Sequence, residues 1–83
     1  MRIRASAFKH DLTETDISHA WNNALAFFDI DPDKEPIKSL CIGADTAGNL
    51  LESLYLQLED VDLIIHAMPL RPQFAQYLTG DES

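Results

Sequence analysis

The first part of the chain carries the apolar repeat of an amphipathic helix. After Thr13, apolar side chains recur at the spacing of one helix face: Ile17, Ala20, Trp21, Ala24 and Leu25. Thr13 and Asp16 stand three residues apart, as the two side chains of a capping box do, with Asp in place of the usual Glu or Gln. The pattern therefore predicts a helix over residues 14–25. A shorter helical turn is expected over residues 6–10.

The pattern changes to that of strands after this helix. Segments 27–30, 37–42, 50–58 and 61–68 are aromatic, β-branched or alternating, and polar turns separate them. Asp45 and Gly48 fall between the second and third segments, where a hairpin loop needs residues that tolerate positive φ. Because the connections are short, we expect the last three segments to form an antiparallel meander that helices cover on one face.

The third strand segment alternates most clearly. Leu54 and Leu56 point to one side, with Glu52 as the odd member of that set, and Tyr55 points to the other side. We expect the Leu54/Leu56 face to pack against the helix stripe that contains Trp21. Core packing is the expected role of Trp21, and contact with a partner is the alternative.

Two prolines end the strand pattern, and a last helix is expected beyond them. Pro69 closes the final strand, and Pro72 suits the first position of a helix. The packing face of that helix consists of Leu70, Phe74, Tyr77 and Leu78. The expected fold is a single α+β domain over residues 1–83, with one or more N-terminal helices on a three- to four-stranded antiparallel sheet and a short C-terminal helix.

Length and composition agree with one small domain. The chain has 83 residues, of which 46% are hydrophobic, and its one cysteine, Cys41, leaves no internal disulfide. No apolar run approaches the ~20 residues that a membrane helix needs. Arg2 and Arg4 are followed by a polar segment where a signal peptide would be apolar. We therefore expect a cytoplasmic protein without membrane contact.

The charge balance is strongly acidic. Fourteen acidic residues against six basic ones give a net charge of −8. A protein that binds nucleic acid unaided normally has a basic surplus, so this balance argues against such binding. The acidic surplus either keeps a small domain soluble or meets a basic partner.

Few residues in the sequence are candidates for chemistry. Scattered histidines, a lone cysteine and isolated glycines provide no metal-binding spacing and no phosphate loop, so no metal and no cofactor are expected. His66 is a candidate general acid or base, or else a strand residue with a structural hydrogen bond. Arg71 is a candidate phosphate or carboxylate clamp, or else a solvated side chain. Lys9 and His10 form a candidate catalytic or anion-binding pair, or else part of a solvated loop.

The order of the segments resembles a known family. Residues 8–13 (Phe-Lys-His-Asp-Leu-Thr) are similar to the Lys-His-Gly-Val-Ser segment of BrnT-type toxins, small proteins with a RelE-like fold from bacterial type II toxin–antitoxin systems. Residues 40–43 and 48–51 resemble that family's Ile-Gly and Gly-x-Leu-Leu positions, and residues 64–67 its Ile-Ser-Ala-Arg stretch. The resemblance covers most of the chain.

This resemblance implies RNA cleavage and a small antitoxin encoded nearby. Lys9 and His10 match the family's Lys-His pair, whereas His66 replaces its serine and Met68 stands in place of its arginine. The last helix, basic in those toxins, has no cation beyond Arg71 at its start. Activity is therefore expected to be low or lost.

Two functions remain open at this point. One is a toxin-like, metal-independent endoribonuclease that uses Lys9, His10, His66 and Arg71. The other is a non-enzymatic interaction module on the same scaffold, bound to a partner or to itself as a homodimer or hetero-oligomer. We expect the four residues to form one basic cluster in the first case and to be scattered in the second.

Overall fold

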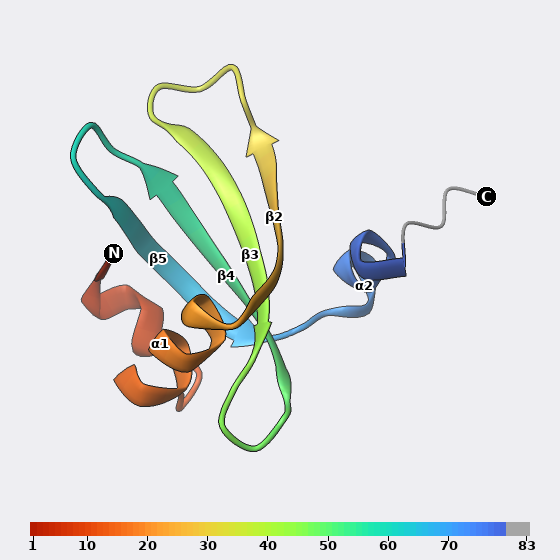
Figure 1. Cartoon of the computed structure of the whole chain (residues 1–83). Helices are drawn as coiled ribbons and strands as arrows, with labels where there is room; N and C mark the ends of the chain where they lie inside the picture. The colour runs from red at the N-terminus through yellow and green to blue at the C-terminus, as the bar shows by residue number, and fades with distance from the viewer. Residues whose placement is uncertain (80–83) are drawn as a thin grey trace.

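Eight elements follow one another along residues 1–79, the part of the chain that the computed structural model describes (Figure 1). They are β1 (Arg2–Ile3), the 3-10 helix η1 (Ala5–Phe8), α1 (Glu14–Asn22), β2 (Ala24–Asp31), β3 (Ile37–Ala44), β4 (Leu50–Gln57), β5 (Asp62–Pro69) and α2 (Pro72–Thr79). The chain is thus a small α+β domain with short N-terminal helices, a mostly antiparallel sheet and a short C-terminal helix.

The sheet has five strands in the order β1-β5-β4-β3-β2. Strands β2 to β5 form a continuous antiparallel meander, which confirms the expected pairing of segments 50–58 and 61–68. The fifth strand, β1, pairs in parallel with the outer edge of β5, Arg2 opposite Leu63 and Ile3 opposite Ile64. Two residues are too few to show alternation, so the sequence pattern could not predict this strand.

Helix α1 begins where the capping box predicts and ends three residues earlier than expected. Asp16 N donates to Thr13 Oγ1 at 3.1 Å, and Thr13 N donates to Asp16 Oδ2 at 3.0 Å. At the other end, Asn23 leaves helical geometry and its Nδ2 donates to the His19 carbonyl oxygen at 2.9 Å. The helix stops there because the residues from Ala24 onward pair with β3, starting opposite Gly43.

The close contact between α1 and the sheet depends on Gly43 of β3. A Cβ atom at this position would overlap the backbone carbonyl group of Ala20 in α1. Only glycine therefore lets the helix backbone approach the strand this closely. Ala20 itself is buried against the strand.

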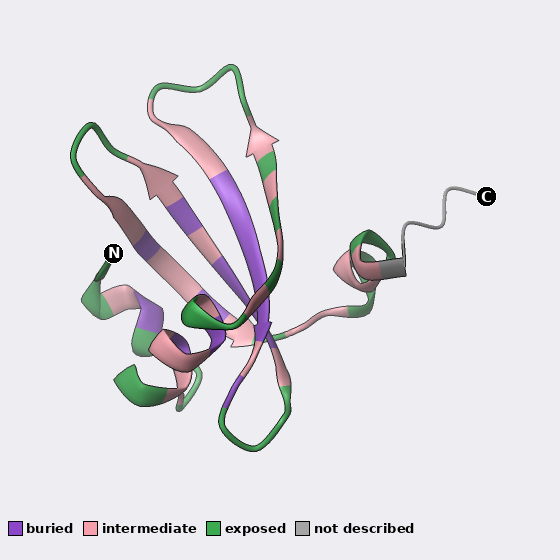
Figure 2. Cartoon of the chain, in the orientation of Figure 1, coloured by how far each residue is buried: buried purple, intermediate pink, exposed green. Residues whose placement is uncertain are grey.

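The face of β4 that meets α1 is the opposite of the one expected, so that prediction was wrong. Tyr55 is buried, and its ring lies 4.9 Å from the ring of Trp21 in an edge-to-face arrangement. Leu54 and Leu56 point to the other face and are half-buried. Apolar residues occupy both sides of β4 because both faces of the sheet contain buried side chains, and Figure 2 shows buried residues along the central strands. Trp21 is only half-buried, so only part of its side chain packs in the core.

The second face of the sheet carries its own apolar cluster beneath α2. Leu40 and Ile42 of β3 are fully buried on it. Phe28 of β2 lies opposite Leu40, and its ring contacts that of Tyr77 in α2 with centroids 4.6 Å apart. In the expected packing face of α2, Phe74 and Leu78 are half-buried and Tyr77 is exposed. The last helix therefore crosses from the end of β5 toward β2 (Figure 1).

Candidate functional site

The structure brings His10 and His66 together, although 55 residues separate them in the chain. The N-terminal segment runs along the edge of β5, where Arg4 N donates to Ile64 O at 2.8 Å and Ser6 Oγ donates to Ile65 O at 2.7 Å. As a result, the ring of His10 lies edge-to-face against the ring of His66, with centroids 5.1 Å apart. Two imidazoles at this spacing can act on the same bound group.

Arg71 lies beside the histidine pair and is held by Glu52. The Glu52 carboxylate is fully buried and accepts three hydrogen bonds from Arg71: from its backbone N to Oε1 at 2.9 Å, and from Nε and Nη2 to Oε2 at 3.0 and 2.7 Å. The guanidinium also lies over the ring of Phe74, 5.0 Å from its centroid. Neither side-chain bond uses Nη1, and the Arg71 side chain is 39% exposed, so part of the guanidinium faces solvent.

The other three predicted residues act electrostatically on His66. Burial lowers the pKa of His66, and the neighbouring positive charges of His10, Arg71 and Lys9 lower it further, while Glu52 acts in the opposite direction. The imidazole is therefore neutral at pH 7 and able to accept a proton. We name these residues (Lys9, His10, Glu52, His66 and Arg71) the histidine cluster.

The contact with Met68 favours one tautomer of the His66 imidazole. The Nε2 atom of His66 lies 3.1 Å from the Met68 sulphur, which can only accept a hydrogen bond. A bond between them requires the proton on Nε2, and the lone pair of the ring is then on Nδ1. Met68 thus contacts the imidazole of His66 directly.

Glu52 is the member of the histidine cluster that the sequence did not identify as a site residue. Its one signal was its place as the only charged residue in the apolar alternation of β4. A fully buried carboxylate requires a partner. That partner could not be predicted, because Arg71 lies just before α2, beyond the whole of β5.

Two other residues considered from the sequence have structural roles. Cys41 is buried in the core, and burial raises the pKa of its thiol to about 12. The Nδ1 atom of His19 lies 2.8 Å from the carbonyl oxygen of Ala44, so His19 connects α1 to the end of β3. Neither lies in the histidine cluster.

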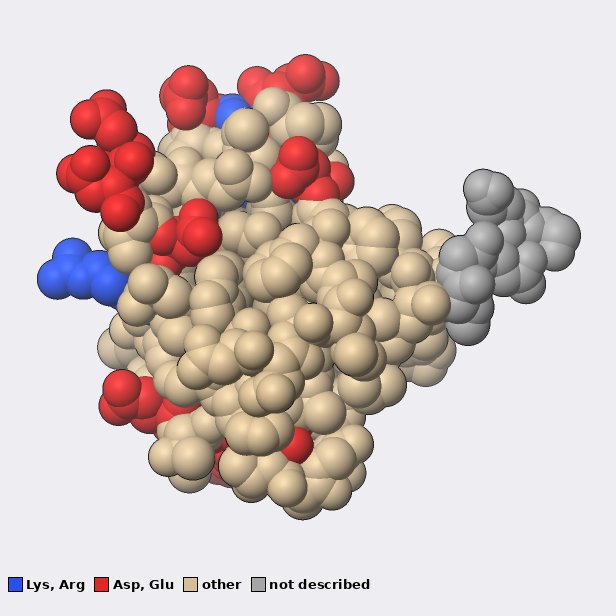
Figure 3. Space-filling model, in the orientation of Figure 1, with Lys and Arg blue, Asp and Glu red and all other residues tan. Residues whose placement is uncertain are grey.

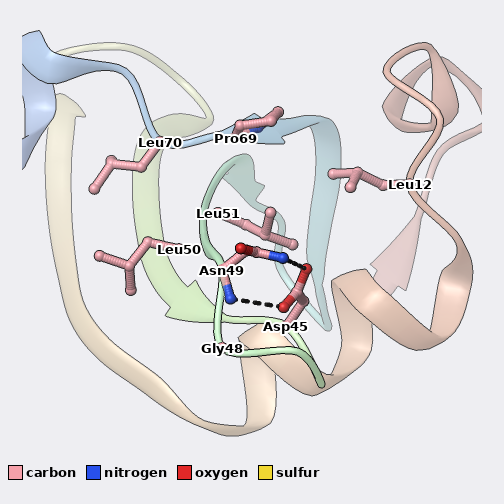
Figure 4. A pocket seen from close by; sticks show the side chains of 8 residues that line it. All are labelled: Leu12, Asp45, Gly48, Asn49, Leu50, Leu51, Pro69 and Leu70. Carbon is pink, nitrogen blue, oxygen red and sulfur yellow. Dashed lines mark hydrogen bonds between the residues drawn. The ribbon is translucent and has the colours of Figure 1, made fainter.

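A hollow of about 610 Å³ lies between the segment after η1, the β3–β4 loop and the end of β5 (Figure 4). Its lining is mostly apolar: Leu12, Asp45, Gly48, Asn49, Leu50, Leu51, Pro69 and Leu70. The Asp45 carboxylate is satisfied within the loop by Ala47 N, Asn49 N and Asn49 Nδ2, at 2.9, 2.8 and 3.3 Å. The hydrogen bond from the Asn49 backbone is the largest cause of the lowered pKa of Asp45, and the bonds from Asn49 Nδ2 and Ala47 N lower it further. Together these bonds stabilise the hairpin loop.

Two classes of site have no counterpart in residues 1–79. No group of three or more His, Cys, Asp or Glu side chains is arranged there to hold a metal ion. Within the same residues, no helix is both long enough and apolar enough to cross a membrane.

Comparison with known proteins identifies no relative of this chain. No protein-family model, no curated protein and no solved structure matches the chain. The functional interpretation therefore rests on the geometry of the histidine cluster.

Proposed function

We propose that this chain is a toxin-like endoribonuclease of low activity, a BrnT-like component of a type II toxin–antitoxin system on a RelE-like scaffold. The observation that carries the proposal is the His10–His66 ring pair, 5.1 Å apart, beside Arg71 and Lys9. His10 contacts His66, and the charges of Arg71 and Lys9 also act on His66, which supports the enzyme over a purely structural set of side chains.

The chemistry that these groups suit is attack of an RNA 2′-oxygen on the adjacent phosphorus. A base removes the 2′-hydroxyl proton, the P–O bond to the 5′-oxygen breaks, and an acid protonates the leaving oxygen. The products are a 2′,3′-cyclic phosphate and a 5′-hydroxyl, and neither metal nor water takes part in this step. His66, neutral at pH 7, serves as the base, His10 as the acid, and Arg71 with Lys9 as the cations that stabilise the phosphate.

Two features support a low rate. The positive charge of Arg71 is largely compensated by Glu52, so the histidine cluster offers less attraction to phosphate than its cations suggest. The net charge of −8 repels RNA at long range and weakens binding before chemistry begins. A small antitoxin encoded nearby fits the same proposal as the partner that controls the residual activity.

Expression in bacteria tests this proposal at the level of function. Wild-type protein should arrest growth, and both His66→Ala and His10→Ala should relieve the arrest at equal protein level. His19→Ala removes a histidine outside the cluster and should leave the arrest in place. Each purified variant is melted by circular dichroism, so that relief through unfolding is recognised. Normal growth with wild-type protein, or undiminished arrest with His66→Ala, would contradict the proposal.

A specific observation favours the alternative, a non-enzymatic interaction module. Phe27 and Leu25, two residues apart in β2, are 50% and 64% exposed and leave apolar surface in contact with solvent. A module of this kind would bind a partner through β2 and would tolerate loss of both cluster histidines without loss of binding.

A further inference from the structure

Three aromatic rings form a patch on the α1 side of the sheet. Trp21 of α1, Phe27 of β2 and Tyr55 of β4 meet edge-to-face, with centroids 5.3 Å (Trp21–Phe27), 4.9 Å (Trp21–Tyr55) and 6.1 Å (Phe27–Tyr55) apart. Phe27 nevertheless remains half exposed, because α1 ends at Asn22 and leaves the far part of this face uncovered (Figures 1 and 2). We call these three residues the aromatic patch.

A fixed carboxylate borders the aromatic patch. Asp29 follows Phe27 by two residues in β2 and lies on the same face. Its Oδ1 accepts hydrogen bonds from Ser39 Oγ at 2.8 Å and from Gln57 Nε2 at 3.0 Å, and Gln57 Nε2 also donates to Ser39 Oγ at 2.8 Å. Both bonds to the carboxylate end on Oδ1 and hold the group in place beside the rings. The Asp29 side chain is exposed, so Oδ2 can meet an incoming cation.

The charge around the patch is predominantly negative. Acidic side chains gather at the strand ends above an uncharged area of the α1 side in Figure 3. Seven acidic residues lie at this end of the sheet, against three basic ones: Lys34, Lys38 and Arg2, which pairs opposite Leu63. The acidic residues are Asp29, Asp31, Asp33, Glu35, Glu59, Asp60 and Asp62. Such a field attracts a positively charged partner and repels nucleic acid or a second copy of this acidic chain.

We propose that the aromatic patch and Asp29 dock a positively charged protein segment, with an arginine or lysine of the partner on the exposed ring of Phe27 and beside the Asp29 carboxylate. The pairing combines a cation–π contact with a charge-assisted hydrogen bond. Apolar side chains next to that cation would cover Phe27 and Trp21. This surface goes beyond the proposed function and does not depend on it, because β4 and β3 separate β2 from the strand that carries His66.

Trp21 provides the readout, because it is the only tryptophan in the chain. The probe is a synthetic peptide of alternating arginine and leucine, compared with the same peptide in which glutamate replaces arginine. Titration should give a saturable change in Trp21 emission with the arginine peptide, weaker at high salt, and none with the glutamate peptide. Phe27→Ser and Asp29→Asn should each weaken binding about tenfold.

Two matched variants distinguish binding at a defined site from binding that depends only on net charge or on exposed apolar surface. Asp33→Asn removes the same charge from the β2–β3 turn, and Phe8→Ser removes another exposed phenylalanine outside the patch; both should change binding less than about twofold. The proposal is overturned if no saturable change is seen, or if Asp33→Asn weakens binding as much as Asp29→Asn. It is also overturned if sedimentation shows a dimer of the chain that Phe27→Ser dissociates, or if an RNA oligonucleotide binds the patch in preference to the peptide.

Discussion

Glu52 and Arg71 form an ion pair with unequal burial: the carboxylate is fully buried, whereas the Arg71 side chain is 39% exposed. The three hydrogen bonds of this pair join β4 to the start of α2 and fix the guanidinium beside His66. The pair therefore links the stability of the fold to the geometry of the histidine cluster.

The unequal burial predicts unequal effects of mutation. Arg71→Met should destabilise the fold by about 3–5 kcal/mol, because it leaves a buried carboxylate without its charge partner. Glu52→Gln should cost about 1–2 kcal/mol, because the exposed part of Arg71 keeps its contact with water. Urea unfolding of both variants measures the difference. Equal effects, or a larger effect of Glu52→Gln, would contradict this reading of the pair. Histidine variants are for this reason cleaner tests of chemistry than Arg71 variants.

Gly43→Ala tests the close approach of α1 to β3. The added methyl group would overlap the Ala20 carbonyl group, so α1 must move, and we expect a loss of about 3 kcal/mol in unfolding free energy. Gly48→Ala is the matched control: its φ is 88° but no atom lies within 4 Å, so only the backbone conformation is strained, at about 1 kcal/mol. If the two variants melt at the same temperature, the helix does not pack against Gly43 as described.

The lowered pKa of His66 predicts a pH dependence. A histidine whose folded pKa lies below its unfolded value of about 6.5 binds more protons when unfolded, so stability falls as pH drops from about 6.5 through the folded pKa. His66→Asn should lose less stability than wild type over this range. An NMR titration of His66 should give a pKa below 6.5, and His10→Ala should raise it, because the His10 charge is one of its causes. A His66 pKa above 6.5 would contradict the account.

Cys41 should be chemically silent in the native state. Burial raises the pKa of its thiol to about 12, so almost no thiolate is present at pH 8. A thiol reagent such as 5,5′-dithiobis(2-nitrobenzoate) should react only after unfolding, at the rate of global opening. Fast reaction in native buffer would show that the core around Cys41 opens locally.

Local sequence signals predicted much of the fold. The capping box placed the start of α1 at Glu14, and the alternation and turn residues predicted the order and antiparallel direction of β3 to β5. The end of α1 could not be predicted, since Ala24 and Leu25 continue the helical spacing and only pairing with β3 turns them into strand. The choice of core face on β4 failed for a similar reason: leucines lie on both sides of a strand that is covered on both faces.

The candidate site was predictable in its members but not in its arrangement. Side-chain chemistry and the family resemblance identified the candidates Lys9, His10, His66 and Arg71. Neither signal gives the distances between these residues in the fold. Their meeting depends on the two-residue strand β1, which lays the N-terminal segment along β5, and on the Glu52–Arg71 pair. Both are long-range contacts that leave little trace in local sequence.

Cleavage of RNA by the purified protein tests the central claim most directly. A single-stranded RNA oligonucleotide of mixed sequence is incubated at low salt with EDTA, and the products are identified by mass spectrometry. Wild-type protein should yield ends with a 2′,3′-cyclic phosphate and a 5′-hydroxyl, slowly. His66→Ala and His10→Ala should each lower the rate by about 100-fold or more, whereas His19→Ala should not. Intact RNA with the wild-type protein, or equal cleavage by wild-type protein and the His10→Ala/His66→Ala double variant, would contradict the claim.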